Sequence, residues 1–167
     1  MIYVLDTNIV ATFRKKRPHP AVMQWASEVG MHELATTVIT VAEIECGIQK
    51  ARLTAPETAD DVEEWLKTIL ADGQPQILGM SIAASRLIGR MYMTPRLRSF
   101  VITDPTARKP ASGADLAIAA IATTEGAVVA TAGIDHFLRI HAEFPLPGLF
   151  NPVSGEWHVE PTLGPGP

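Results

Sequence analysis

Apolar and polar positions follow two patterns that alternate along the chain. Short runs rich in Val, Ile and Leu are typical of buried strands, whereas apolar residues three or four positions apart indicate helices with one buried face. Val41, Ile44 and Ile48 have the helical spacing, for example. We therefore expect strands at residues 2–5, 34–37, 74–80, 127–131 and 145–150, and helices at 7–14, 18–30, 40–51, 56–69, 81–92, 112–126 and 134–140.

Strands that alternate with helices and are joined by short connections predict an α/β fold. The expected architecture is a three-layer sandwich with a mainly parallel central sheet. A chain of 167 residues is long enough for one domain with a substantial core. We expect this domain to span residues 1–152 and to be followed by a flexible C-terminal tail at 153–167.

Carboxylates recur at the ends of these elements. Asp6 follows the first strand directly, Glu43 lies near the start of the helix at 40–51, and Asp115 near the start of the helix at 112–126. Ligands of parallel sheets bind outside the carboxyl ends of the strands, where Asp6 lies. Carboxylates that converge repel one another and are stabilised by a divalent cation, and Mg²⁺ and Mn²⁺ accept oxygen ligands from separate elements.

Helix capping is an alternative role for two of these acids. Thr40 with Glu43, and Ser112 with Asp115, have the spacing of a capping box, in which the acid bonds back to the amide of the cap residue. The spacing alone leaves capping and metal binding open for both acids.

Asp6 has the same alternative, but its neighbours favour a functional role. Thr7 and Asn8 already provide caps for the helix that follows, so Asp6 is not needed there. A water bound to a metal ion is acidified and can attack a phosphodiester. Asp6 is therefore a candidate metal ligand of a phosphodiester-cleaving enzyme.

Four segments resemble, in order, the PIN domain of VapC-type toxins from bacterial toxin–antitoxin pairs. Each is weakly specific by itself, but together they match the family from residue 1 to about residue 152, nearest to its FitB-like or NtrR-like branch. The segments are MIYVLDTNIV at 1–10, ITVAEIECGI at 39–48, GADLAIAAIA at 113–122 and VVATAGIDHF at 128–137, followed by FNP at 150–152.

The resemblance implies a Mg²⁺- or Mn²⁺-dependent endoribonuclease, the toxin of a type II toxin–antitoxin pair, with a Rossmann-related fold. Asp6, Glu43 and Asp115 match the family's acidic positions. Asn8 would orient Asp6, and Thr131 matches the family's hydroxyl after the late strand. The implied partners are an RNA substrate, a cognate antitoxin that inserts a segment into the cleft, a second copy of the chain, and operator DNA contacted only through the antitoxin.

The last motif departs from the family pattern. Relatives commonly have Thr-Arg-Asn or Thr-Arg-Asp there, whereas this chain has Thr131, Ala132 and Gly133. Asp135 is a candidate fourth metal ligand, with helix capping as its alternative. The missing acid also motivates a second hypothesis, in which a catalytically weak PIN-like module acts by binding, through an antitoxin and operator complex.

The charge balance limits how RNA is held. The formal net charge is −4 at pH 7, which argues against binding by bulk electrostatics, because phosphate neutralisation needs Lys and Arg. Basic residues cluster at 14–17, at 96 and 98, and at 108–109, and the last two clusters lie in the stretch 94–112, where we expect a loop. Its Arg96, Arg98, Arg108 and Lys109 are candidates for phosphate contacts.

Cysteine and histidine patterns exclude other classes. Cys46 is the only cysteine, so an intramolecular disulfide cannot form and a reducing cytoplasm is expected. The five histidines contain no pair at the four-residue spacing of a helical zinc site. The sequence has neither a signal-peptide pattern nor a membrane-span pattern, so we expect no membrane association.

Overall fold

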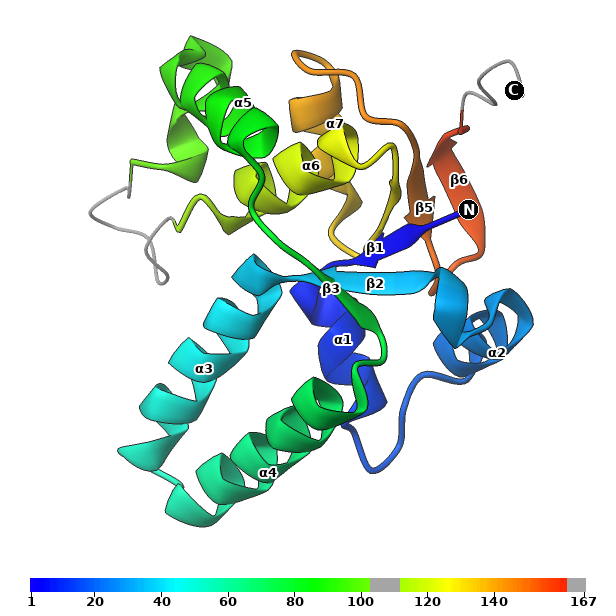
Figure 1. The fold of residues 1–167 in the computed structure, drawn as a ribbon, viewed down its shortest axis with the longest axis vertical. Helices are drawn as coiled ribbons and strands as arrows, with labels where there is room; N and C mark the ends of the chain where they lie inside the picture. The colour runs from blue at the N-terminus through cyan, green and yellow to red at the C-terminus, as the bar shows by residue number, and fades with distance from the viewer. Residues whose placement is uncertain (103–111, 162–167) are drawn as a thin grey trace.

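The computed structural model describes residues 1–102 and 112–161 of the chain (Figure 1). The sheet has the order β3-β2-β1-β4-β5-β6, in which the first five strands pair in parallel and β6 pairs with β5 antiparallel. Its strands are β1 (Tyr3–Leu5), β2 (Leu34–Thr37), β3 (Gln76–Leu78), β4 (Val128–Ala130), β5 (Leu149–Asn151) and β6 (Glu156–Val159).

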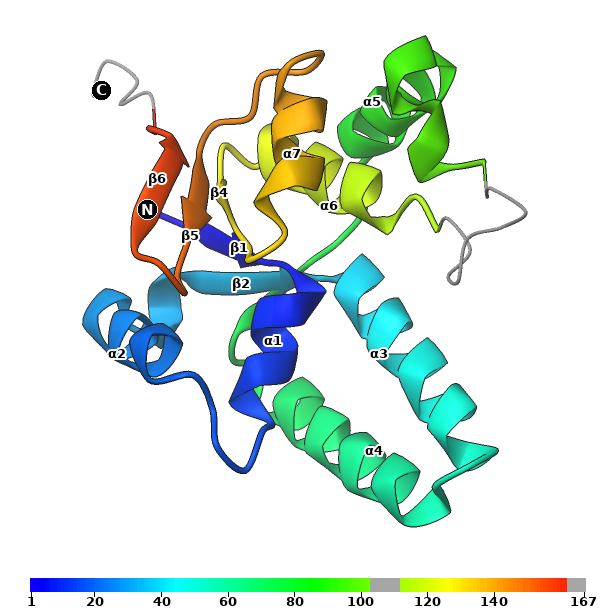
Figure 2. The ribbon, with the colours of Figure 1, turned by 180° about the vertical axis from the view of Figure 1, so that it is seen from behind.

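Helices cover both faces of the sheet. Helices α5 to α7 pack on one face and α1 to α4 on the other, as the two opposite views show (Figures 1 and 2). This arrangement confirms the predicted α/β sandwich with a mainly parallel sheet. The helices are α1 (Thr7–Phe13), α2 (Pro20–Val29), α3 (Val38–Arg52), α4 (Pro56–Asp72), α5 (Ile82–Met93), α6 (Ala114–Thr124) and α7 (Ile134–His141), with the 3-10 helices η1 (Met31–Glu33) and η2 (Pro95–Phe100).

The strands are apolar at successive positions because both of their faces are buried. Val4 and Val129 join the core beneath α5, α6 and α7, whereas Leu5 and Ala130 join the core against α1 and α2. Successive side chains of a strand point to opposite faces, so a strand with two covered faces has no polar alternation. The continuous Val- and Leu-rich runs of the sequence follow from this burial.

The strand order reverses between β1 and β4, and this point positions the site. From β1 the chain adds β2 and β3 on one side, whereas β4 adds β5 and β6 on the other. Asp6 and Thr131 are the residues that directly follow β1 and β4. The Asp6 amide donates to the Ala130 carbonyl at 3.0 Å, which brings the two strand ends together. Such reversal points are where open α/β sheets bind ligands.

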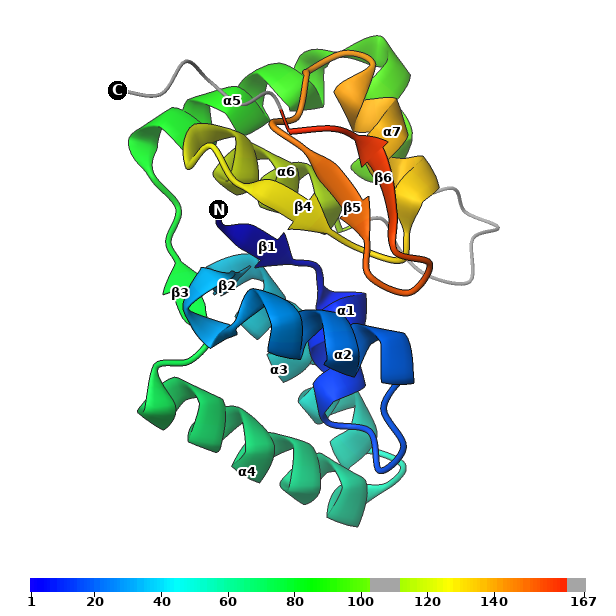
Figure 3. The same ribbon diagram turned by 90° about the vertical axis from the view of Figure 1, so that its right-hand side faces the viewer.

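Helices α3 and α4 form an antiparallel hairpin that extends away from the sheet (Figures 1 and 2), and α4 lies on its side farther from the strands (Figure 3). Its own small core contains buried Ile48, Ala59 and Leu66. Ile44 and Trp65 contact both this cluster and the larger core around β1. The base of the hairpin is thus fixed to the sheet, while its far end depends on local packing.

The predicted tail begins too early. Glu156–Val159 forms β6 at the edge of the sheet, where the Trp157 ring lies 4.9 Å from Phe150 and 6.2 Å from Tyr3 between centroids. Polar residues alternate with half-buried Trp157 and Val159, which is a strand pattern too short to stand out among Gly and Pro. Residues 162–167 lie outside the described part.

The predicted loop at 94–112 also needs correction. Pro95–Phe100 forms η2, because Leu97 and Phe100, three residues apart, are both buried. Arg96 is exposed and pairs with Glu143 at 2.9 Å. Arg108 and Lys109 lie outside the described residues. No helix among the described residues is long and apolar enough to cross a membrane.

We expect Trp157→Ala to lower the free energy of unfolding by about 2 kcal/mol, less than for a fully buried Trp, because it removes a half-buried ring from the aromatic cluster. Chemical denaturation monitored by circular dichroism measures this. Glu160→Ala, an exposed change just beyond β6, is the control and should shift stability by less than about 0.5 kcal/mol. Equal stability of the two variants would mean that β6 does not contribute to the fold.

Candidate active site

Asp6 lies where β1 ends and α1 begins. Its backbone is extended and it is the N-cap of α1, with Oδ1 accepting a hydrogen bond from the Thr7 amide at 2.7 Å. Oδ2 accepts from Thr131 Oγ1 at 2.7 Å and from Asn8 Nδ2. The residue is only 6% exposed. Asp6 is thus the cap of α1, in place of Thr7 or Asn8 as the sequence suggested, and it also accepts hydrogen bonds from α1 and from the end of β4.

Asn8 and Thr131 connect these strand ends. Asn8 Nδ2 lies 3.0 Å from Thr131 Oγ1, and Asn8 Oδ1 accepts from the Ala132 amide at 3.1 Å. Thr131 Oγ1 also accepts from the Gly133 amide at 2.8 Å. The turn after β4 is thus fixed to α1 by side chains whose orientation depends on Asp6. Both residues were predicted at this site from the sequence.

Glu43 approaches the same region from α3, where its carboxylate accepts a hydrogen bond from Thr7 Oγ1. The helix begins at Val38, not at Thr40 as predicted, because Thr37 is the N-cap and its Oγ1 accepts from the Thr40 amide at 3.1 Å. Both threonines are good caps, and the extended backbone at the end of β2 selects the earlier one. Glu43 is therefore too far along α3 to act in a capping box.

Asp115 lies in the first turn of α6, whose N-cap is Gly113 with a positive φ of 69°. Its Oδ2 is 2.7 Å from His136 Nδ1. Within the described residues the Asp115 carboxylate bonds this histidine and not the amide of Ser112. The Phe100 ring meets the imidazole edge-on, with 5.5 Å between centroids, and so supports its position.

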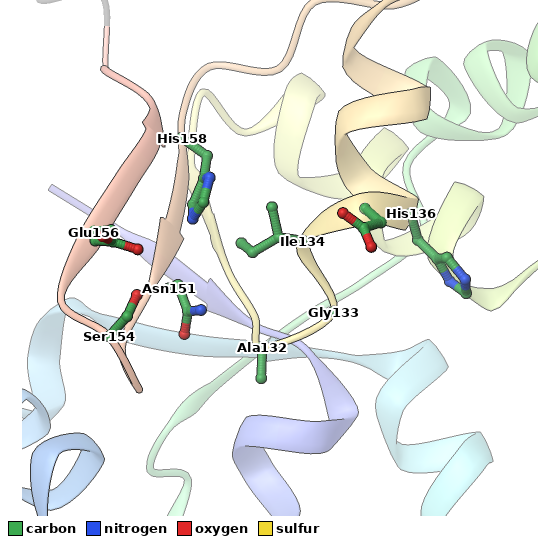
Figure 4. A pocket seen from close by; sticks show the side chains of 9 residues that line it. Ala132, Gly133, Ile134, His136, Asn151, Ser154, Glu156 and His158 are labelled. Carbon is green, nitrogen blue, oxygen red and sulfur yellow. The ribbon is translucent and has the colours of Figure 1, made fainter.

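Asp135 is not joined to these acids. It is exposed in the first turn of α7 and, in the described part of the chain, makes no hydrogen bond to another predicted site residue. It lines a neighbouring depression instead (Figure 4).

Sequence reasoning missed Thr7 and His136 as hydrogen-bond partners of the acids. No spacing rule distinguishes the Thr7 hydroxyl from a simple helix-start residue. His136 lies 21 positions from Asp115 in sequence, so only the packing of α7 on α6 brings them together.

The acids share one electrostatic environment. The pKa of Asp6 is raised from 3.8 to about 6, chiefly by burial and further by the negative charges of Asp115 and Glu43. Hydrogen bonds from Thr131 and Thr7 lower this pKa but only partly offset the increase. Acids from α3 and α6 thus raise the pKa of the carboxylate that follows β1.

The acids are nevertheless not arranged as a closed ligand cluster. Among residues 1–102 and 112–161, no three His, Cys, Asp or Glu side chains are grouped closely enough to hold a metal ion. The hydrogen bonds explain this separation, because Glu43 turns toward Thr7 and Asp115 toward His136. Each of the two outer carboxylates has a protein donor of its own.

No family model matches the chain. Over 65 residues it is 42% identical to ribonuclease VapC14 of Mycobacterium tuberculosis, which covers 39% of this chain and 63% of that relative. The alignment thus spans less than two thirds of this relative's length.

Solved structures extend the similarity along the chain. The structure of FitAB bound to an IR36 DNA fragment matches with a TM-score of 0.66 and 26% identity, covering 94% of this chain and 99% of that one. VapBC2 from Rickettsia felis, bound to a DNA fragment from its promoter, matches in fold with a TM-score of 0.64 and 23% identity, covering 94% and 99%. With the ordered motifs and the fold described above, these similarities show that the chain resembles the VapC-type PIN-domain toxins.

Proposed function

We propose that this protein is a divalent-metal-dependent endoribonuclease, the toxin of a type II toxin–antitoxin pair. The observation that carries the proposal is the buried Asp6 carboxylate at the reversal point of the sheet, with Glu43 and Asp115 close enough to raise its pKa. The similarity to a protein named a ribonuclease supports RNA as the substrate.

The acids suit a hard divalent cation such as Mg²⁺ or Mn²⁺. The three carboxylates offer only oxygen donors, and their mutual repulsion is relieved when a cation binds between them. We assign Asp6, Glu43 and Asp115 as the residues that would hold it. A bound ion of this kind activates water and stabilises negative charge on a phosphoryl oxygen.

Other side chains orient these acids. Thr131 and Asn8 fix the plane of the Asp6 carboxylate, and Asn8 also fixes the turn after β4 through the Ala132 amide. Thr7 and His136 hold Glu43 and Asp115 by hydrogen bonds. Charged acids in a partly buried site are thereby kept at defined positions beside the substrate phosphate.

A groove beside Glu43 suits the antitoxin that the resemblance implies. A cavity of about 720 Å³ runs between α3, α5 and α6, with a largely apolar lining that includes Ile39, Ile88 and Tyr92. A segment bound there would reach Glu43 and could direct a cation at the acids. The FitAB and VapBC2 complexes with DNA support an antitoxin that contacts the operator, and we infer a homodimer from the family resemblance.

We expect the purified protein to cut single-stranded RNA with Mn²⁺ or Mg²⁺ and to lose this activity in EDTA. Asp6→Ala, Glu43→Gln and Asp115→Asn should each lower the rate by about 100-fold or more, because each removes a ligand of the ion. Glu45→Gln, an exposed change on α3, is the matched control. Gel analysis of a labelled RNA measures cleavage.

Two results would contradict this assignment. Undiminished cleavage by Asp6→Ala would exclude Asp6 as a ligand. A wild-type protein that binds its antitoxin but cuts no RNA with either metal would favour the second hypothesis, a binding module that has lost catalysis.

The raised pKa of Asp6 predicts how stability depends on pH without metal. The folded protein holds this proton more tightly than the unfolded chain, so the stabilisation is present at low pH and is lost as pH rises through about 6. From pH 4 to pH 8 in EDTA, wild type should lose up to about 3 kcal/mol of stability relative to Asp6→Asn, which does not titrate. Urea denaturation at each pH measures the difference, and a constant difference would contradict the raised pKa.

The Thr131 hydroxyl lowers the pKa of Asp6, so Thr131→Val should raise it. We expect the acid limb of the pH profile of kcat/KM to move to higher pH, with a loss of about tenfold at pH 6. Thr131→Ser keeps the hydroxyl and should retain the wild-type profile. If Thr131→Val slows cleavage equally at every pH, the hydroxyl does not act through the Asp6 proton.

A further inference from the structure

A second depression opens beside the candidate active site. It has a volume of about 450 Å³ and lies between the turn after β4, the start of α7 and the hairpin of β5 and β6 (Figure 4). We call it the hairpin depression; its lining includes Ala132, Ile134, Asn151, Ser154, Glu156 and His158.

The hairpin depression lies next to the side chain of Asn8, which bonds to Asp6. The Ala132 amide in its lining donates to Asn8 Oδ1, and Asn8 Nδ2 in turn donates to Asp6. The next residue, Gly133, has no side chain to separate the two regions. A nucleotide next to a phosphate held at Asp6 can therefore extend its base into the hairpin depression.

The lining suits a base better than a phosphate. Glu156 and Asp135 both carry negative charge there, which disfavours an anion. Ile134, an apolar residue of the lining, lies across from the Glu156 and His158 side chains, while the imidazole of His136 points away (Figure 4). Flat bases are commonly held between an apolar or aromatic surface and polar groups that read their edges.

Two polar groups are available to read the base. The Asn151 Oδ1 accepts from the Val153 amide at 2.9 Å, which fixes the side chain in its turn, while its Nδ2 makes no hydrogen bond to the described residues. The Glu156 carboxylate is exposed and has no ion-pair or hydrogen-bond partner in the described part of the chain. A carboxylate and an amide donor thus line the same depression.

We propose that the hairpin depression is a nucleobase subsite that selects guanine in the nucleotide next to the cut bond, with Glu156 as its specificity-determining residue. This inference rests on the proposed function. Guanine presents N1–H and N2–H side by side, which one carboxylate accepts together, and O6 next to them, which an amide N–H satisfies.

Other bases do not offer this edge. Adenine and cytosine each place an unprotonated ring nitrogen beside one amino group, so a carboxylate oxygen faces a second acceptor. Uracil offers a single N3–H between two carbonyl oxygens. Guanine therefore makes more hydrogen bonds to the carboxylate than the other bases do.

The test compares RNAs that differ at one base. A cut site is mapped in a single-stranded RNA, and the guanine beside it is replaced by inosine, which lacks only the N2 amine, or by adenine. We expect wild type to prefer guanine over inosine by about tenfold in kcat/KM, as for the loss of one charge-assisted hydrogen bond. Glu156→Gln should remove this preference, whereas Glu160→Gln, an exposed change just beyond β6, should retain it.

Binding provides a readout that needs no cleavage. In NMR titrations without metal, the dinucleoside monophosphate ApG should shift the imidazole signals of His158 more than ApA does, and Glu156→Gln should abolish the difference. Cleavage without base preference at either neighbouring position, or a guanine preference that survives Glu156→Gln, would overturn the subsite. If wild type cuts no RNA, the proposed function fails, and the ApG titration alone then decides whether the subsite exists.

Discussion

The buried carboxylate of Asp6 is the constraint on which the site depends. An ionised group that is 6% exposed loses most of its hydration, and the protein replaces it with donors from Thr7, Asn8 and Thr131. These donors come from α1 and from the end of β4, so satisfying the carboxylate also fixes the two strand ends to each other. Stability and chemistry at this position are therefore coupled.

The same need for hydrogen-bond donors explains why the acids stay apart. Glu43 and Asp115 each have a donor, Thr7 or His136, so like charges are spread over separate hydrogen bonds. The departure from the family pattern at Ala132 and Gly133 also affects the shape of the site. Small residues there line the depression beside the β5 and β6 hairpin where relatives commonly carry a charged side chain.

Much of the fold was predictable because both faces of the sheet are buried, which leaves continuous apolar runs in the sequence. The order of the strands in the sheet was not predictable, because no local sequence pattern indicates that β4 pairs with β1. The start of α3 and the strand β6 were predicted wrongly because local sequence signals allow more than one structure there. Thr37 and Thr40 are equivalent caps until the end of β2 is known, and the short apolar alternation around Trp157 is hidden among Gly and Pro.

Within the site, the sequence indicated Asp6, Asn8, Glu43, Asp115 and Thr131, because acids and amides at element ends follow from the topology and from the family pattern. Their hydrogen-bond partners could not be indicated in the same way. The contact of His136 with Asp115 exists only because α7 packs on α6, with Phe100 of η2 against the imidazole. Such contacts depend on distances between elements that sequence spacing does not encode.

The hairpin of α3 and α4 has a consequence for local dynamics. Its distal core has only three buried residues, so the far end has little apolar surface to hold it closed and will open independently of the sheet. Ile44 and Trp65 limit this local opening, because they also contact the larger core around β1. Glu43 adjoins Ile44, on the side of the hairpin that stays closed. The far end of this hairpin can therefore flex without displacing the acid at its base.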